Sequence, residues 1–196
     1  MTSKEFEFTL LIDLPFDYDA AERALFDAGC DDAIVGVRYG CLFVDFARIA
    51  ESLPVAVFAA MEEVAKVGLC VRRIDSCELV NQAEIASQIG YSRQAFAPYV
   101  KGDRGPGNFP PPICHIDDDH SPLWKWCEVA QWLYSNQMIS QQSLQEAFFL
   151  DLMNGMLDIK RQSSRDPDLA KSIGEYVDKF DCGCSSIPKN KEAATS

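Results

Sequence analysis

The sequence lacks the features that usually mark a membrane protein or an enzyme. Its longest apolar runs, such as "LPVAVFAAM", are too short to cross a bilayer. Its start, "MTSKEFEFTLLIDL", has charges and alternation where a signal peptide has an apolar core. Only two histidines occur among 196 residues, and no phosphate loop or nucleophile–base pair stands out. We therefore expect a cytoplasmic protein with no catalytic activity, no cofactor and no membrane association.

Paired metal-ligand spacings are also missing. Eight cysteines are scattered along the chain, and in a reducing compartment we expect most of them to be free and buried, as small apolar side chains. Cys114, His115, His120 and Cys127 lie close in sequence but lack the paired spacing of zinc ligands. The C-x-C near the C-terminus has no further ligands around it. The sequence predicts no metal site.

Positive charge is scarce, and the net charge is −12. Residues 1–78 contain 7 basic and 15 acidic residues, a net charge of −8. Residues 79–134 contain 4 basic and 6 acidic residues, and residues 135–196 contain 7 basic and 9 acidic residues. Each of these segments therefore has a net charge of −2. The uneven distribution leaves room for a local basic surface beyond residue 78, whereas the acidic first segment favours a protein partner over nucleic acid.

Residues 1–78 show alternating strand and helix patterns. "FEFTLLIDL" predicts a strand, and the next segment predicts a helix capped by Asp19 and ended by Gly29. "DAIVGVRYGCLFVDF" predicts a hairpin. A second helix follows, capped by Ser52 and ended by Gly68, and "CVRRIDSCELV" predicts a last strand. The resulting β-α-β-β-α-β order is that of a ferredoxin-like, or split βαβ, domain.

Two short helices joined by a tight turn are predicted after residue 78. Asn81 and Glu84 resemble a capping box, and Gly90 ends the first helix. Ser92 caps the second helix, which Pro98 limits to about two turns. Such a pair predicts a helix-turn-helix, whose second helix enters the DNA major groove.

A small β-hairpin, or wing, is predicted around "HIDDDHS". Its second strand would hold Trp124 and Trp126 on one face, and a helix would begin near Glu128. A winged helix-turn-helix has a small core, so we expect the tryptophans to fill it and not to stack on bases. The three aspartates at residues 117–119 would repel phosphate, so either the wing tip points away from DNA or the wing does not touch it.

The runs "EIASQIGYSRQAF", "GDRGPGNFPPPI" and "LWKWCEVAQWL" together resemble the winged helix-turn-helix of AlpA-type, excisionase and MerR-type regulators. The shared pattern is the "EIA…G.SR" helix pair, then "G.FP.P", then a tryptophan-bearing strand and "V..WL". The resemblance covers about residues 79–134, and it implies binding to double-stranded DNA.

The resemblance also implies a set of DNA-binding residues. Ser92, Arg93 and Gln94 fall at the start of the second helix, where base and phosphate contacts are expected. Lys101 and Arg104 fall in the turn before the wing, where phosphate contacts are expected.

Residues 135–181 are predicted to be helical, and residues 182–196 to form a disordered polar tail. One amphipathic stripe in the helical segment consists of Leu144, Phe148, Leu152, Met156 and Ile159. This stripe could pack within the chain or on a second copy. We expect a homodimer, because two half-sites combine effectively in DNA binding.

The sequence thus predicts an α+β protein with three parts: a ferredoxin-like domain at 1–78 for partner or ligand binding, a winged helix-turn-helix at 79–134 and a dimerisation segment at 135–181. The predicted function is a DNA-binding transcriptional regulator. The alternative is a protein-interaction module, such as an antitoxin or anti-repressor, whose acidic N-terminal domain binds a protein partner.

Overall fold

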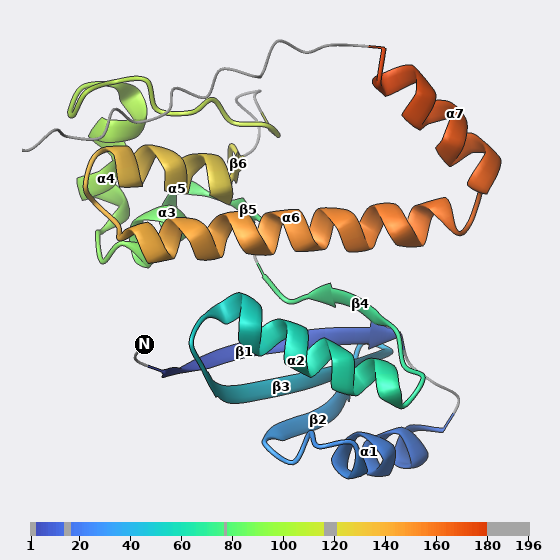
Figure 1. Cartoon of the computed structure of the whole chain (residues 1–196). Helices are drawn as coiled ribbons and strands as arrows, with labels where there is room; N and C mark the ends of the chain where they lie inside the picture. The colour runs from blue at the N-terminus through green and yellow to red at the C-terminus, as the bar shows by residue number, and fades with distance from the viewer. Residues whose placement is uncertain (1–2, 14–16, 77, 116–120, 180–196) are drawn as a thin grey trace, which may run out of the picture. The chain divides into compact units, whose positions relative to one another are not determined.

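The computed structural model describes residues 3–13, 17–76, 78–115 and 121–179 (Figure 1). The chain divides into two compact units, Met1–Asp158 and Ile159–Ser196. The fold is α+β, with an N-terminal four-stranded antiparallel sheet and its helices followed by a mostly helical region. The predicted fold class is confirmed at this level. The predicted domain boundaries remain predictions.

The N-terminal elements follow the predicted β-α-β-β-α-β order. They are β1 (Lys4–Asp13), α1 (Tyr18–Asp27), β2 (Ala33–Arg38), β3 (Cys41–Ala50), α2 (Leu53–Lys66) and β4 (Val71–Ile74). The strands lie in the order β2-β3-β1-β4, and each pairs with its neighbours in antiparallel fashion. Tyr39 and Gly40, with φ of 52° and 72°, form the tight turn of the predicted hairpin.

Two helix caps differ from the prediction. Asp17, not Asp19, caps α1, because the Asp17 carboxylate accepts a hydrogen bond from the backbone N–H of Ala20 at 3.0 Å. Ser52 precedes α2 as predicted, but its side chain makes no capping hydrogen bond. Pro54 in the first turn of α2 is favourable there because a first-turn N–H has no partner within the helix.

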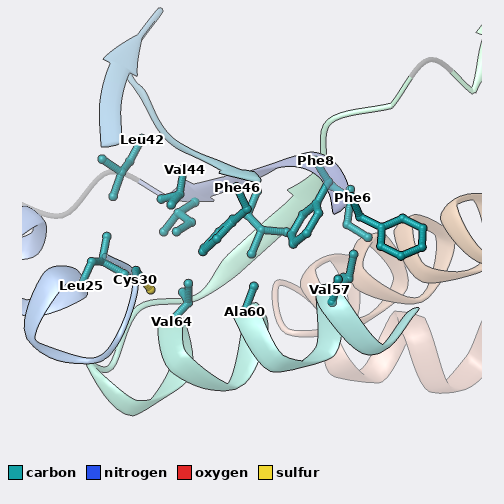
Figure 2. Packing of buried hydrophobic residues seen from close by; sticks show 14 of the residues in the cluster. Phe6, Phe8, Leu25, Cys30, Leu42, Val44, Phe46, Val57, Ala60 and Val64 are labelled. Carbon is teal, nitrogen blue, oxygen red and sulfur yellow. The ribbon is translucent and has the colours of Figure 1, made fainter. Parts of the chain in front are cut away.

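The core of the sheet lies on the face that α1 and α2 cover (Figure 2). Strands β1 and β3 alternate buried and less buried residues, as the period of two requires. Figure 2 shows the labelled buried side chains of the sheet turned toward the helices. The rings of Phe8 and Phe46 are stacked, with centroids 5.2 Å apart. Leu25 from α1 and Val57 from α2 close this core.

A charged cluster ties the loop after α1 to the sheet. The Arg48 guanidinium donates two hydrogen bonds to Asp32, at 2.9 and 2.8 Å, and one to Glu63 at 2.8 Å. It also lies 4.8 Å from the centroid of the Phe46 ring. The hydrogen bonds from Arg48 hold the pKa of the Asp32 carboxyl below its usual range. Only 13% of the Arg48 side chain is exposed, so the cluster joins β3, α2 and the loop from a partly desolvated position.

Replacing Arg48 with methionine should destabilise the protein by about 1–3 kcal/mol near neutral pH, because two partly buried carboxylates lose their partner. The lowered pKa of Asp32 means that its contribution is present above the unfolded-state pKa of 3.8 and is lost as pH falls through the lower folded-state pKa. Urea denaturation at about pH 7 and pH 3 should therefore show a smaller difference between wild type and Arg48→Met at the acidic pH. An equal difference at both values would contradict this role of Arg48.

The remaining elements are mostly helices. They are β5 (Leu79–Val80), α3 (Gln82–Gln88), α4 (Arg93–Lys101), β6 (Trp124–Lys125), α5 (Trp126–Ser135), α6 (Gln141–Ser163) and α7 (Pro167–Val177). Among the described residues, none of the helices combines the length and apolar character needed to span a membrane.

The predicted wing strand is wrong in two respects. Trp124 lies in β6, but β6 pairs with β5, where Val80 is the partner of Trp124. Trp126 is not on the strand: it is the first residue of α5, which therefore begins two residues before the predicted Glu128. The backbone N–H of Trp126 donates a hydrogen bond to the Glu78 carbonyl at 2.7 Å, and the chain turns into the helix at that point. Cys114 and Leu123 form one isolated antiparallel bridge, while the predicted tip at 117–119 lies outside the described residues.

Helix α6 packs against both preceding groups of elements. Leu144 and Ala147 pack with Ala130 of α5. Further along, Phe149 and Met153 join the core of the sheet. These contacts place α6, as far as Asp158, within the same compact unit as the sheet.

The Asn154 clip, a set of hydrogen bonds from the Asn154 side chain, joins α6 to the edge of the sheet. Asn154 is buried, accepts a hydrogen bond from the Ile74 N–H at 2.8 Å and donates to the Ile74 carbonyl at 2.9 Å. Its amide also donates to the Ser76 hydroxyl at 3.0 Å. Because β4 is an edge strand of the sheet, this side chain satisfies outward-facing backbone groups that have no strand partner among the described residues.

Candidate nucleic-acid interface

Side-chain caps fix the ends of the two short helices α3 and α4. The Asn81 side chain accepts hydrogen bonds from the N–H groups of Ala83 and Glu84, and the Glu84 carboxylate accepts one from the Asn81 N–H at 2.7 Å. This is the predicted capping box. Gly90, with a φ of 72°, carries the turn. The Ser92 hydroxyl then accepts a hydrogen bond from the Ala95 N–H at 3.2 Å, as predicted for the cap of α4.

The first turn of α4 presents polar side chains on a buried support. Arg93 and Gln94 are exposed, whereas Phe96 on the same helix is fully buried. The Gln82 side chain donates to the Arg93 carbonyl at 3.2 Å, which ties the start of α4 to α3. We did not predict this bond from the sequence, because nothing in the local pattern around Gln82 distinguishes it from other polar helix residues. Arg93 is thus held at its backbone, and its side chain makes no hydrogen bond or ion pair with the residues that the structure describes.

The second pair of predicted residues lies at the other end of α4. Lys101 is the last residue of the helix, which spans nine residues and agrees with the predicted two turns. The Pro98 carbonyl accepts hydrogen bonds from the N–H groups of Asp103 and Arg104, at 2.9 and 3.1 Å. The Arg104 guanidinium lies 5.1 Å from the centroid of the Tyr99 ring. Arg104 is therefore oriented by a cation–π contact while it remains exposed.

A hollow of about 370 Å³ brings two of the predicted residues together. Arg93 and Lys101 both line it, together with Gln82, Ser121 and Trp124. Gln94 and Arg104 are not among its lining residues. The geometry therefore places Arg93 and Lys101 at one concave surface and leaves Gln94 and Arg104 outside it.

Tryptophans anchor the loop that follows α4. Trp132 donates from Nε1 to the Gly107 carbonyl, and Trp124 donates from Nε1 to the Pro110 carbonyl, each at 2.9 Å. Both side chains are buried, at 8% and 4% exposure, so their predicted core role is confirmed. The Phe109 ring lies between them, with centroids 5.1 Å from Trp132 and 6.0 Å from Trp124. The anchored loop fixes the turn that carries Arg104.

Gly105 lets the loop after α4 lie close to the Tyr99 ring. Gly105 has a φ of 82°, and a Cβ placed there would lie 3.0 Å from the Tyr99 ring. Both the backbone conformation and the close approach favour glycine at this position.

The described cysteines behave as separate thiols. Cys30, Cys41, Cys70, Cys114 and Cys127 are free. Only Cys30 and Cys127 among them are buried, so the expected burial holds for part of the set. Burial raises the pKa of the Cys127 thiol to about 11, and the nearby negative charge of Asp151 contributes to the same shift. Within the described ranges no group of three histidine, cysteine or acidic residues could hold a metal ion; His120 lies outside them.

No protein-family model, curated protein sequence or solved structure matches this chain.

Proposed function

We propose that the protein is a DNA-binding transcriptional regulator, in which α3 and α4 form a helix-turn-helix and α4 is the recognition helix. The observation that carries the proposal is the first turn of α4, where Arg93 and Gln94 are exposed directly after the Ser92 cap. The N-terminal residues of a recognition helix reach base edges in the major groove. In this proposal the segments 113–115 and 121–125, joined by the Cys114–Leu123 bridge, belong to a small wing. Residues 1–78 form a ferredoxin-like domain, which the β2-β3-β1-β4 order supports.

In this proposal the predicted DNA-binding residues make two kinds of contact, to base edges and to phosphates. Arg93 can donate two hydrogen bonds to guanine, and Gln94 can pair with adenine. Lys101 and Arg104 follow the helix and suit phosphate oxygens, which fix the position of the protein on the duplex. The Ser92 hydroxyl already accepts one hydrogen bond within the chain, so its expected contribution is to hold the helix end that faces DNA.

Arg93→Ala should weaken binding to cognate DNA. A bidentate contact to guanine is worth about 1–3 kcal/mol, and its loss should relax the preference at one base position. Arg104→Ala should instead weaken binding to all sequences alike and reduce the salt slope by about one, as expected for a phosphate contact. Binding isotherms on cognate and scrambled duplexes at several salt concentrations separate the two patterns.

Arg23→Ala is the matched control, because Arg23 is exposed on α1 and its replacement removes the same charge from a different surface. It should leave the salt slope and the sequence preference unchanged. If Arg93→Ala and Arg104→Ala both bind cognate DNA like the control, α4 is not the recognition helix.

The exposed face of α6 supports a homodimer. Phe148, Leu152 and Met156 are 43%, 65% and 60% exposed, although they are large apolar residues one helical turn apart. Leu144, which we predicted in the same stripe, is instead buried against α5 of the same chain. A second copy would cover the remaining stripe, and two recognition helices would then reach two half-sites.

The acidic character of residues 1–78 favours the second candidate, a protein-interaction module. Within the described ranges strand β2 pairs only with β3, so its other edge can accept an added strand. Its exposed residues Ile34 and Val37 would contact such a partner. Purification of the native protein distinguishes the candidates, because a module of this kind would bring a stoichiometric protein partner and no specific DNA.

A further inference from the structure

The sheet has a second face that α1 and α2 do not cover. Thr9 and Leu11 of β1, and Phe43 and Asp45 of β3, alternate with the core residues and therefore point to this face. A hollow of about 710 Å³ lies over it. All of its lining residues come from strands and turns of the N-terminal sheet, including Arg38 and Asp75. The hollow is separate from the candidate nucleic-acid interface on α4.

The floor of the hollow is apolar and partly aromatic. Phe43 is paired in register with Leu11 on one side and with Gly36 on the other. A Cβ at Gly36 would lie 2.5 Å from Cζ of Phe43, so the ring tip occupies the space that a side chain on β2 would need. The glycine lets the ring lie across the neighbouring strand, where it offers an apolar surface to the hollow.

Carboxylates gather at one end of this floor. The Thr9 hydroxyl donates a hydrogen bond to Asp45 at 2.6 Å, and the Thr9 carbonyl accepts one from the Asp75 N–H at 2.9 Å. Asp45 and Asp75 thus flank the same residue, and both line the hollow. The hydroxyl also orients the Asp45 carboxylate, and the backbone bond places Asp75 beside it on the neighbouring strand edge.

The other end of the floor carries a positive charge. Arg38 pairs with Cys41 in the hairpin, and its guanidinium lies 5.4 Å from the centroid of the Phe43 ring. Cys41 is four residues before Asp45 on β3, a separation of about 13 Å at the usual rise per strand residue. The surface therefore runs from two carboxylates to an aromatic ring beside which the Arg38 guanidinium lies.

We propose that this hollow binds an organic cation, a ligand with an ammonium group joined to a flat apolar body. The ammonium group pairs with Asp45 and Asp75, and the apolar body covers Phe43 and Leu11. A charged group leaving water needs an opposite charge and hydrogen-bond acceptors, and the two carboxylates supply both. The Arg38 guanidinium beside the Phe43 ring repels a cation from that end and so fixes the orientation. The net charge of −8 on residues 1–78 also raises the local concentration of cations. This inference does not depend on DNA binding.

Calorimetric titration of the full chain with tryptamine tests the proposal, with indole-3-propionate as the matched anion. We expect saturable binding of tryptamine and much weaker binding of the anion. Asp45→Asn and Asp75→Asn should each weaken tryptamine binding about tenfold, because each removes one charged hydrogen-bond acceptor. The asparagine amide oxygen can still accept the Thr9 hydrogen bond, so the fold should persist. Asp27→Asn, on the exposed surface of α1, should leave the affinity unchanged.

Amide resonances locate the ligand in the same samples. Tryptamine should shift the resonances of Leu11 and Phe43 in the wild type, with smaller shifts in Asp45→Asn at equal ligand concentration. Equal binding of tryptamine and indole-3-propionate would overturn the proposal, as would unchanged affinity in both asparagine variants. Shifts of the same resonances on raising the protein concentration alone would also overturn it, because a second copy would then occupy the face.

Discussion

Replacing Phe148 and Leu152 together with aspartate is expected to convert the protein from a dimer to a monomer. Both side chains lie on the exposed side of α6, so the change removes apolar surface from the proposed interface and places four carboxylates in it across the two copies. Burial of one such side chain is worth about 1.5–3 kcal/mol, so dimerisation should weaken by well over a hundredfold. Light scattering at micromolar protein concentration gives the readout.

The fold should survive this double substitution. The side of α6 that carries Phe149, Met153 and Asn154 holds the helix to the sheet, and it is unchanged. Phe26→Asp is the matched control, because Phe26 is 65% exposed on α1 and lies outside the stripe. That variant should remain dimeric. A wild-type protein that is monomeric at the same concentration would contradict the proposed interface.

Trp132→Ala is expected to lower the free energy of unfolding by about 3–5 kcal/mol, the usual effect of truncating a large buried aromatic residue. The indole is almost fully buried, its ring contacts Tyr99 and Phe109, and its N–H bonds to the Gly107 carbonyl. Its loss therefore empties a core and frees the loop that carries Arg104. Urea denaturation followed by circular dichroism measures the change.

Trp126→Phe provides the comparison for this substitution. Trp126 is only partly buried, and the replacement keeps an aromatic ring, so we expect an effect of about 1 kcal/mol. If Trp132→Ala is no more destabilising than Trp126→Phe, the aromatic cluster is not what stabilises the α4–α5 region.

Local interactions explain what could be predicted from the sequence. The capping box at Asn81 and Glu84, the Ser92 cap and the hairpin turn at Tyr39–Gly40 each depend on residues within a few positions of one another. The alternation in β1 and β3 follows from one covered and one open face. These signals predicted the N-terminal elements and the two short helices, and they also predicted that Arg93 lies at the start of the second helix.

Contacts between distant residues explain what could not be predicted. Trp124 pairs with Val80, far earlier in the chain, and this pairing rather than the local pattern of tryptophans decides where β6 ends and α5 begins. The bond from Gln82 to the Arg93 carbonyl and the Asn154 clip are likewise invisible in local patterns. On α6, periodicity defines an apolar stripe but does not tell that Leu144 packs within the chain while Phe148 is exposed.

The most direct test of the proposed function is to immunoprecipitate the native protein from cells and to sequence the DNA that it retains. We expect discrete sites, each with two half-sites separated by about one helical turn of DNA or a multiple of it. The same procedure with Arg93→Ala should recover these sites less efficiently and with one relaxed base position. Recovery of a stoichiometric protein partner without any enriched DNA sequence would contradict the regulator and would favour the protein-interaction module.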